Sequence, residues 1–257
     1  MNPRLRTSHR VDGSGARWVT FVTGIANDLT LWDGQLAAVP AGFKVLRYDL
    51  RGHGGSEATP GDYSMELLSN DLVELLGAVG AEKTSLVGLG LGGALAQAFA
   101  IAHPARVERL MPCCCRAQMV PDFAALWHQL RDTVKANGLE SIVEPTVQRW
   151  FSDEFKAAHP EVLDKVRRMI RGTSQQGYLG VTGAFLGLTV EDRLAEITCP
   201  TLYVSGAADP LGGPPPLMEG LSRKVKGARH VSVPHAAHIA NIQNPDGFNQ
   251  VLREFLT

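Results

Sequence analysis

Residues 87–97, VGLGLGGALAQ, join an apolar run to a run of small residues through a glycine-rich turn. A sharp turn between a strand and a helix presents its central residue at the edge of a sheet. That central residue is Gly90, which has no side chain to present. The stretch therefore predicts an α/β fold, and it leaves open whether the chain catalyses anything.

Short β-type runs alternate with helical patterns along much of the chain. Several of the runs are continuously apolar, as strands buried on both faces are. The expected strands are residues 17–23, 43–49, 84–89, 107–113, 200–206 and 229–234. The helical patterns between them are residues 64–79, 93–102 and 245–256. This alternation predicts a mostly parallel, doubly wound sheet with helices on both faces.

The alternation stops near residue 120 and resumes near residue 190. Between these points amphipathic helical patterns follow one another, such as FAALWHQLRDTVKANG and HPEVLDKVRRMIRG. We interpret residues 120–190 as a helical cap inserted into a core formed by residues 1–119 and 191–257. The stretch LGGPPPL (211–217) is expected to be a stiff loop.

The amino-acid composition and net charge indicate which kind of partner the protein binds. The 257 residues are 44% apolar and 20% charged, with a formal net charge of -1. These values are typical of a packed globular protein, and they lack the basic surplus expected for binding nucleic acid or an anionic membrane. We expect a small-molecule partner and leave open whether the chain forms a homo-oligomer. The first 15 residues lack the apolar run of a secretory signal, so a cytoplasmic location is expected.

Four cysteines, Cys113, Cys114, Cys115 and Cys199, show no C-x-x-C spacing. Consecutive residues of a strand point to opposite faces, so the run of three cannot form an ordinary zinc cluster. We expect buried, reduced thiols and no metal site.

Two motifs fit the glycine turn. Gly88, Gly90 and Gly93 match G-x-G-x-x-G, the dinucleotide-binding fingerprint, and Glu108 lies about 20 residues further on. The ribose-binding acid should, however, end the next strand, whereas Glu108 lies at the start of residues 107–113. The second motif is a nucleophile elbow, G-x-S-x-G, with Gly90 in place of the serine.

Three further features favour the elbow. The apolar run within residues 21–33 leads into a loop in which the backbone N–H of Ile25, together with that of Leu91, would form an oxyanion hole. Asp209 and His238 each follow a strand. The order elbow, acid, base is the chain order of a large class of hydrolases.

The chain resembles the 3-oxoadipate enol-lactonase group of α/β-hydrolases over nearly its whole length, cap included. The resemblance rests on the elbow and on YDLRGHGGS (48–56), RWFSDEF (149–155), QGYLG (176–180), GAADP (206–210) and AAHIANIQNPDGF (236–248). It implies an α/β-hydrolase fold and an esterase or lactonase activity on a small ester or lactone, by a Ser-His-Asp triad without a cofactor. Asp209 and His238 match the triad acid and base. Ile25 and Leu91 match the oxyanion hole.

Four side chains are expected to bind substrate: Trp127, Trp150, Tyr178 and Cys115. Trp127 matches a cap tryptophan that faces the pocket in the resembling group. Trp150 and Tyr178 either line the pocket or pack the cap onto the core. Cys115 follows the strand at 107–113, whose end opens toward the site.

The sequence departs from the group's pattern at several positions. Gly90 replaces the serine, and Cys114 and Cys115 stand where the group usually has Asp-Thr. Leu130 stands where an arginine is usual in a W-x-x-R pattern. Its absence argues against a carboxylate-bearing substrate such as the 3-oxoadipate enol-lactone, because a carboxylate is best held by a bidentate partner. Arg131 is adjacent, but one residue along a helix is a rotation of about 100°.

Three interpretations of Gly90 remain open. The chain is a serine hydrolase whose nucleophile has been replaced, by engineering or by natural variation. Alternatively, His238 and Asp209 act as a general base on water or on a substrate proton. The third interpretation is a non-catalytic protein that binds a small ligand on the hydrolase scaffold.

Two other histidines and two cysteines have reactive side chains for which we expect lesser or structural roles. His235 is the alternative base if His238 is displaced. His53, between glycines, is expected to brace a loop by hydrogen bonds. Cys114 or Cys115 would serve as a displaced nucleophile only with a lowered thiol pKa.

Overall fold

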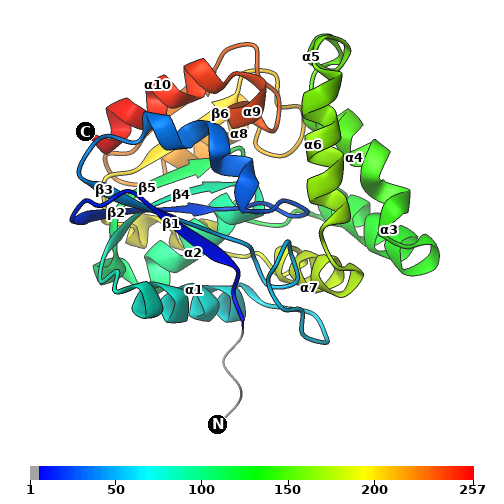
Figure 1. The fold of residues 1–257 in the computed structure, drawn as a ribbon, viewed down its shortest axis with the longest axis horizontal. Coiled ribbons are helices and arrows are strands. Elements are labelled where there is room, and N and C mark those ends of the chain that lie inside the picture. Colours follow the sequence, from blue (N-terminus) through cyan, green and yellow to red (C-terminus); the bar gives the residue numbers. More distant parts are fainter. Residues whose placement is uncertain (1–5) are drawn as a thin grey trace.

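The computed structural model describes residues 6–257, and within them a seven-stranded sheet has the order β1-β3-β2-β4-β5-β6-β7 (Figure 1). Its strands are β1 His9–Asp12, β2 Arg17–Val22, β3 Phe43–Tyr48, β4 Thr84–Leu89, β5 Val107–Cys113, β6 Leu202–Gly206 and β7 Arg229–Val233. Only β1 runs antiparallel to its neighbour, β3; the other pairs are parallel. The predicted mostly parallel sheet is confirmed.

The six strands expected from apolar runs are found, each within two residues of its predicted bounds. The strand β4 is buried along its whole length, which explains its continuously apolar sequence. The edge strand β1, HRVD, was not predicted. Its four residues are mostly exposed and polar, so no hydrophobic pattern marks it.

Helices cover both faces of the sheet. In Figure 1, α1 (Met65–Val79) and α2 (Leu91–Ala102) lie on one side and α10 (Pro245–Leu256) on the other. The 3-10 helix η1 (Leu29–Ala38) packs against α10. The remaining elements of the core are η2 Pro104–Arg106, η4 Glu191–Glu196, α8 Pro215–Ser222 and α9 Ala240–Gln243.

Local sequence sets the ends of these helices. The hydroxyl of Ser64 accepts a hydrogen bond from the backbone N–H of Leu67 (3.0 Å), which caps the start of α1. The helix ends at Gly80, which adopts the left-handed conformation common at helix ends. The stretch 211–217 was expected to be a loop throughout. It is a loop only as far as Pro214, because Pro215 starts α8, where the fixed φ of proline suits the first helical turn.

Two glycines allow α2 to lie directly on the sheet. A Cβ atom at Gly88 would overlap the carbonyl oxygen of Gly92, and one at Gly92 would overlap the carbonyl oxygens of Val22 and Thr23. No larger residue fits at either position. The turn between β4 and α2 is therefore held tightly against the ends of β2 and β4.

A helical insertion, residues 121–186, separates β5 from β6. It consists of α3 Pro121–Asn137, η3 Leu139–Ile142, α4 Val143–Trp150, α5 Asp153–Ala158, α6 Pro160–Arg171 and α7 Gln175–Leu186. Figure 1 shows these helices gathered at one end of the sheet. Side chains from α3 and α4 line a cavity together with Gly90, which directly follows β4. The insertion thus covers the carboxyl ends of the parallel strands, where ligands bind in open α/β sheets.

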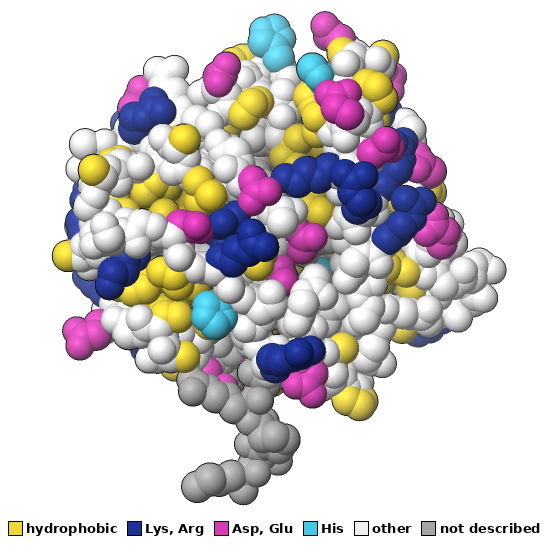
Figure 2. Space-filling model, in the orientation of Figure 1, with side chains coloured by type: hydrophobic (Ala, Val, Ile, Leu, Met, Phe, Trp, Pro, Cys, Tyr) yellow, Lys and Arg dark blue, Asp and Glu magenta, His cyan; other side chains and the backbone are white. Residues whose placement is uncertain are grey.

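The surface agrees with the near-zero net charge. Figure 2 shows Lys and Arg side chains interspersed with Asp and Glu on the face that it presents. Across residues 6–257, no helix combines the length and the apolar character that a membrane crossing requires.

Candidate active site

Gly90 forms the turn between β4 and α2. Its φ of 58° and ψ of −121° lie in a region that glycine adopts freely and that other residues enter only with strain. Its N–H donates to the carbonyl of Cys113 (3.0 Å), and its carbonyl accepts from the N–H of Ala94 (3.1 Å). The backbone at this turn is therefore fixed by both the sheet and the helix.

Asp209 lies in the loop after β6 with its side chain fully buried. Its Oδ1 accepts hydrogen bonds from the backbone N–H groups of Leu211 (3.1 Å) and Gly212 (3.0 Å). Its Oδ2 accepts one from Gly213 (2.8 Å) and one from Nδ1 of His238 (3.0 Å). Burial alone would raise the pKa of Asp209, but His238 and these backbone donors hold the pKa below its usual range. The carboxylate is thus ionised and fixed in place.

His238 is oriented by this carboxylate so that its other ring nitrogen faces the turn. A Cβ atom built on Gly90 would lie 3.5 Å from Nε2 of His238 and 3.8 Å from Cε1, and within 4 Å it would meet nothing else beyond its chain neighbours. The backbone N–H of His238 donates to the carbonyl of Trp150 (3.1 Å) at the end of α4. The histidine is therefore tied to both the core and the insertion, with an open space beside Nε2.

Ile25 and Leu91, whose N–H groups were predicted to form an oxyanion hole, line the cavity beside that open space. Leu91 is the first residue of α2, and the N–H groups of a first helical turn have no acceptor within the helix. The N–H of Ile25 has no acceptor among residues 6–257. Ile25 and Leu91 line the same cavity as Gly90 and His238. An oxyanion hole requires N–H groups without acceptors at such a cavity.

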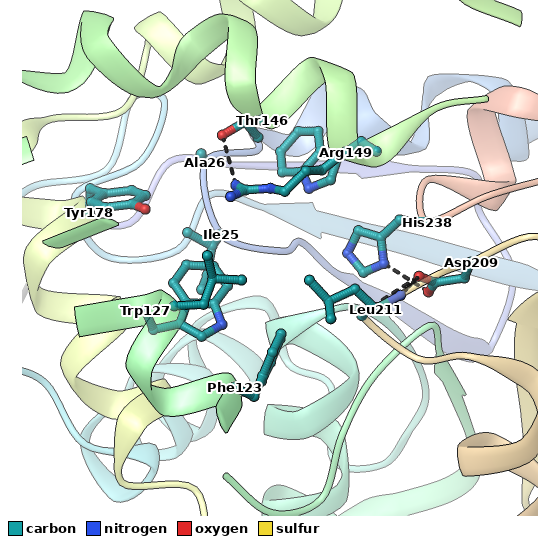
Figure 3. Close-up of a pocket in the computed structure, with 13 residues that line it drawn as sticks. Ile25, Ala26, Phe123, Trp127, Thr146, Arg149, Tyr178, Asp209, Leu211 and His238 are labelled. Atoms are coloured by element: carbon teal, nitrogen blue, oxygen red, sulfur yellow. Dashed lines mark hydrogen bonds and ion pairs between the residues drawn. The ribbon is translucent and has the colours of Figure 1, made fainter. Parts of the chain in front are cut away.

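The cavity has two adjoining chambers that share six lining residues: Ile25, Phe123, Trp127, Trp150, Gly212 and His238. The inner chamber, about 410 Å³, also reaches Gly24, Asn27, Leu89, Gly90, Leu91, Cys114, Cys115 and Phe185. The outer chamber, about 510 Å³, also reaches Ala26, Leu126, Thr146, Arg149, Tyr178, Asp209 and Leu211 (Figure 3). The lining is mostly apolar with a few polar groups, as is typical of a small-molecule site.

Aromatic side chains of the insertion close the cavity. The rings of Phe123, Trp127 and Phe185 meet edge to face, with centroids 5.2–6.1 Å apart. The indole nitrogen of Trp127 is buried and has no hydrogen-bond partner among the described residues. A buried donor left without a partner is costly.

Arg149 brings a positive charge into the outer chamber. Its guanidinium donates to the hydroxyl of Thr146 (3.2 Å), and no carboxylate in residues 6–257 forms an ion pair with it. Burial lowers the pKa of Arg149, against a smaller opposing effect of Tyr178. In Figure 3 the guanidinium and the hydroxyl of Tyr178 point toward the same space. An anionic group of a ligand would fit there.

The thiols next to Gly90 are poorly suited to act as nucleophiles. Cys114 and Cys115 are buried and free, and both line the inner chamber. Burial, together with the nearby carboxylate of Asp209, raises the pKa of both thiols well above the usual value. The lowered pKa that a thiolate nucleophile needs is absent.

The predicted site residues surround one cavity: Gly90, His238, Asp209, Ile25, Leu91, Trp127, Trp150, Tyr178 and Cys115. Two alternatives lie elsewhere. His235, the alternative base, is exposed and lines neither chamber. His53 is buried outside the cavity, where Nδ1 pairs with the carbonyl of Arg51 (3.1 Å), as expected for a residue that braces a loop.

The arginine next to Leu130 does not replace the missing cap arginine. Arg131 is buried and donates to Asp62 and to the hydroxyl of Thr182, and it lines neither chamber. Instead, Arg149 supplies the positive charge from a different helix. Within RWFSDEF (149–155), only Trp150 was predicted to line the cavity, so Arg149 was missed.

The surroundings of Glu108 do not support a dinucleotide-binding site. Glu108, the candidate ribose-binding acid, pairs with Arg17 (2.9 Å) and lies beside the start of β4, the far end of that strand from Gly90. Within residues 6–257, no group of three or more His, Cys, Asp or Glu side chains could hold a metal ion.

The chain is similar to known proteins in both sequence and structure. The sequence model of the alpha/beta hydrolase fold family matches residues 17–245. The chain is 29% identical to 3-oxoadipate enol-lactonase 1 of Acinetobacter baylyi, over 93% of this chain and 88% of that protein. The structure is similar to the crystal structure of the enol-lactonase from Burkholderia xenovorans (TM-score 0.94, 30% identity, 98% and 96% of the two chains). It is also similar to a malate-bound thermophilic esterase from Thermogutta terrifontis (TM-score 0.92, 30% identity, 98% and 93% of the chains).

Proposed function

This chain belongs to the alpha/beta hydrolase fold family, and from that premise we propose that it hydrolyses a carboxylic ester or lactone bond of a small molecule. The similar proteins described above carry the names enol-lactonase and esterase, and each matches over most of this chain. The two-chamber cavity is the proposed substrate site, with the scissile carbonyl in the inner chamber.

One observation carries the proposal: the aligned trio of Asp209, His238 and Gly90. The carboxylate holds Nδ1 of the imidazole, and Nε2 lies 3.5 Å from the position of a Cβ on Gly90. A serine at this turn would place its hydroxyl beside Nε2, as a nucleophile and its general base require. This geometry supports the proposal that Gly90 occupies the nucleophile position of a triad in which Asp209 is the acid and His238 the base.

The missing hydroxyl removes the acyl-enzyme route. In a serine hydrolase, loss of the serine lowers kcat by about 10⁶, and oxyanion hole and binding alone leave about 10³ to 10⁴ over water. Activity of the chain as it stands must therefore come from another nucleophile.

The open space beside Nε2 favours water as that nucleophile. His238 takes a proton from the water as its oxygen bonds to the substrate carbonyl carbon, and the N–H groups of Ile25 and Leu91 hold the resulting oxyanion. Collapse of the intermediate breaks the ester bond. The leaving oxygen then takes the proton from His238, which yields an acid and an alcohol.

Gly90→Ser tests the nucleophile position, with Gly90→Ala as its matched control. Both side chains incur the same backbone strain of about 1–3 kcal/mol at the positive φ, and both Cβ atoms meet His238 only at ordinary contact distance. Only serine adds a hydroxyl. We expect Gly90→Ser to raise kcat for 4-nitrophenyl acetate by about 10²-fold or more and to show a burst of 4-nitrophenol, and Gly90→Ala to show neither.

Gly90→Ser and Gly90→Ala also distinguish water-based hydrolysis from a non-catalytic binding protein. If the native protein uses water, it hydrolyses the ester slowly, His238→Ala abolishes that activity, and the methyl group of Gly90→Ala reduces it by filling the space. If neither the native protein nor Gly90→Ser hydrolyses any ester or lactone, the hydrolase proposal is wrong. A binding protein on the same scaffold would then be the better interpretation.

A further inference from the structure

The space beside Gly90 gives the base access to a carbon atom as well as to water. A Cβ atom built at this position would meet only the ring of His238 within 4 Å, at 3.5 Å from Nε2 and 3.8 Å from Cε1, apart from its chain neighbours. Because Gly90 has no side chain, a substrate carbon in the inner chamber, which Gly90 and His238 both line, can approach Nε2. A carbon held about 3–3.5 Å from Nε2 would be in near-attack geometry, with a C–H proton directed at the base.

The groups that would stabilise an oxyanion also suit an enolate. When a proton leaves the carbon next to a carbonyl, the negative charge moves to the carbonyl oxygen. Ile25 and Leu91 line the inner chamber together with Gly90, and the N–H groups proposed for the oxyanion hole would donate to that oxygen. Ester hydrolysis and enolisation therefore need the same two donors and the same base.

Competing reactions are suppressed in the inner chamber. No hydroxyl group occupies the turn, and the thiols of Cys114 and Cys115 are protonated because they are buried. The rings of Phe123, Trp127 and Phe185 give the chamber an apolar wall. Asp209 holds the imidazole with three backbone N–H groups fixing its own position, so the base keeps one orientation.

We propose that the inner chamber catalyses proton transfer at the carbon next to a carbonyl, and that it isomerises β,γ-unsaturated lactones to their conjugated α,β-unsaturated forms. Nε2 of His238 removes the α-proton, and the electron pair of the broken C–H bond forms the new α,β double bond through a dienolate. The proton then returns from Nε2 to the γ-carbon. No water, oxidant or reductant is consumed. This activity goes beyond the proposed hydrolysis, since it needs the base and the two donors but no nucleophile.

The test uses 5-methyl-3H-furan-2-one, a small β,γ-unsaturated lactone, in D₂O followed by proton NMR. With the native protein we expect loss of the C3 proton signals and appearance of the conjugated isomer, faster than in buffer. His238→Ala should lower the rate about 10²-fold or more, as expected for removal of a general base. Gly90→Ala should also lower it, because its methyl group fills space beside Nε2 through which the substrate carbon approaches.

Gly90→Ser gives the decisive comparison, because the two activities should change in opposite directions. Its hydroxymethyl group blocks access of a carbon to Nε2, so isomerisation should fall while ester hydrolysis rises. Circular dichroism and thermal melting check that each variant is folded. The inference is overturned if the folded native protein exchanges the C3 protons no faster than His238→Ala, or if Gly90→Ala exchanges them at the native rate. The hydrolysis proposal is judged separately, on ester turnover by the native protein and by Gly90→Ser.

Discussion

Arg149 carries a positive charge into a cavity whose carboxylate is already fully engaged. Among the described lining residues, Asp209 is the only acid, and four N–H groups occupy its oxygens. Three other well-buried arginines of the described chain, Arg47, Arg51 and Arg131, each pair with a carboxylate. The outer chamber therefore holds an uncompensated cation, and an anionic ligand would compensate it.

Replacement of this arginine should weaken the binding of carboxylates specifically. We expect hexanoate to bind the native protein more tightly than hexanamide, and Arg149→Gln to remove that preference with a 10- to 100-fold loss of hexanoate affinity, the approximate value of a charge-assisted hydrogen bond. Arg149→Lys should retain part of it. Isothermal titration calorimetry measures both ligands.

Arg168→Gln is the matched control, since Arg168 is an exposed arginine of the same helical insertion. It should bind hexanoate as the native protein does. Equal affinities of the native protein for hexanoate and hexanamide would contradict the role of Arg149.

Single residues were predictable where the fold fixes their place. Asp209 and His238 follow strands β6 and β7, so their positions could be predicted from strand order. The lining role of Arg149 depends instead on how far α4 is rotated about its axis, and each residue step along a helix is a rotation of about 100°. The prediction that Trp150 lines the cavity did not reveal how α4 is rotated. For the same reason, the absence of an arginine at Leu130 could not indicate that Arg149 lines the cavity.

At the scale of elements, the contact of α2 with the sheet decides whether the turn at Gly90 can form. Helix α2 is buried along nearly all of its length and begins at a point where Gly88 and Gly92 touch backbone. Strand positions could be predicted because continuous apolar runs mark strands buried on both faces. The edge strand β1 and the helix α8 could not, because one is short and polar and the other starts within a run of prolines.

Two glycine-to-alanine substitutions in helices should have opposite effects. Gly92→Ala adds a Cβ that overlaps the carbonyl oxygens of Val22 and Thr23, so it should lower the free energy of unfolding by about 1–3 kcal/mol or more. Gly77 lies in α1, where an added Cβ meets nothing within 4 Å. Gly77→Ala should raise the free energy of unfolding by about 0.5–1 kcal/mol through helix propensity.

Urea unfolding of the two variants beside the native protein measures both effects. A Gly92→Ala variant as stable as the native protein would show that α2 does not need this close contact. In that case the turn would tolerate displacement, and the geometry at Gly90 would lose its main support.

At the scale of the whole molecule, the loop that carries His53 joins the core to the helical insertion. The carbonyl of Gly52 accepts hydrogen bonds from the N–H (2.9 Å) and the hydroxyl (3.0 Å) of Ser174, which precedes α7. His53 itself is fully buried. The alternation of strands and helices predicted that an insertion exists. It could not predict this junction, because the contacts join residues that lie 122 positions apart in the chain.

Burial of this imidazole should make the stability of the whole protein depend on pH. Burial lowers the pKa of His53 to about 4, from an ordinary value of 6.5. As the pH falls from 6.5 toward 4, the unfolded chain binds a proton that the folded protein does not, so folding loses stability throughout this window. The loss from this group approaches about 3 kcal/mol near pH 4 and is absent above pH 7.

His53→Gln removes the titrating group, so comparison with it cancels the contributions of every other acid and base. We expect urea unfolding to show that the native protein loses about 3 kcal/mol more than the variant between pH 7.5 and pH 4. The variant is expected to be less stable than the native protein at pH 7.5 if the bond from Nδ1 to Arg51 contributes, and that difference should shrink or reverse in acid. Parallel pH profiles for the two proteins would mean that His53 is protonated in the folded state, and that its loop opens to water without unfolding the junction.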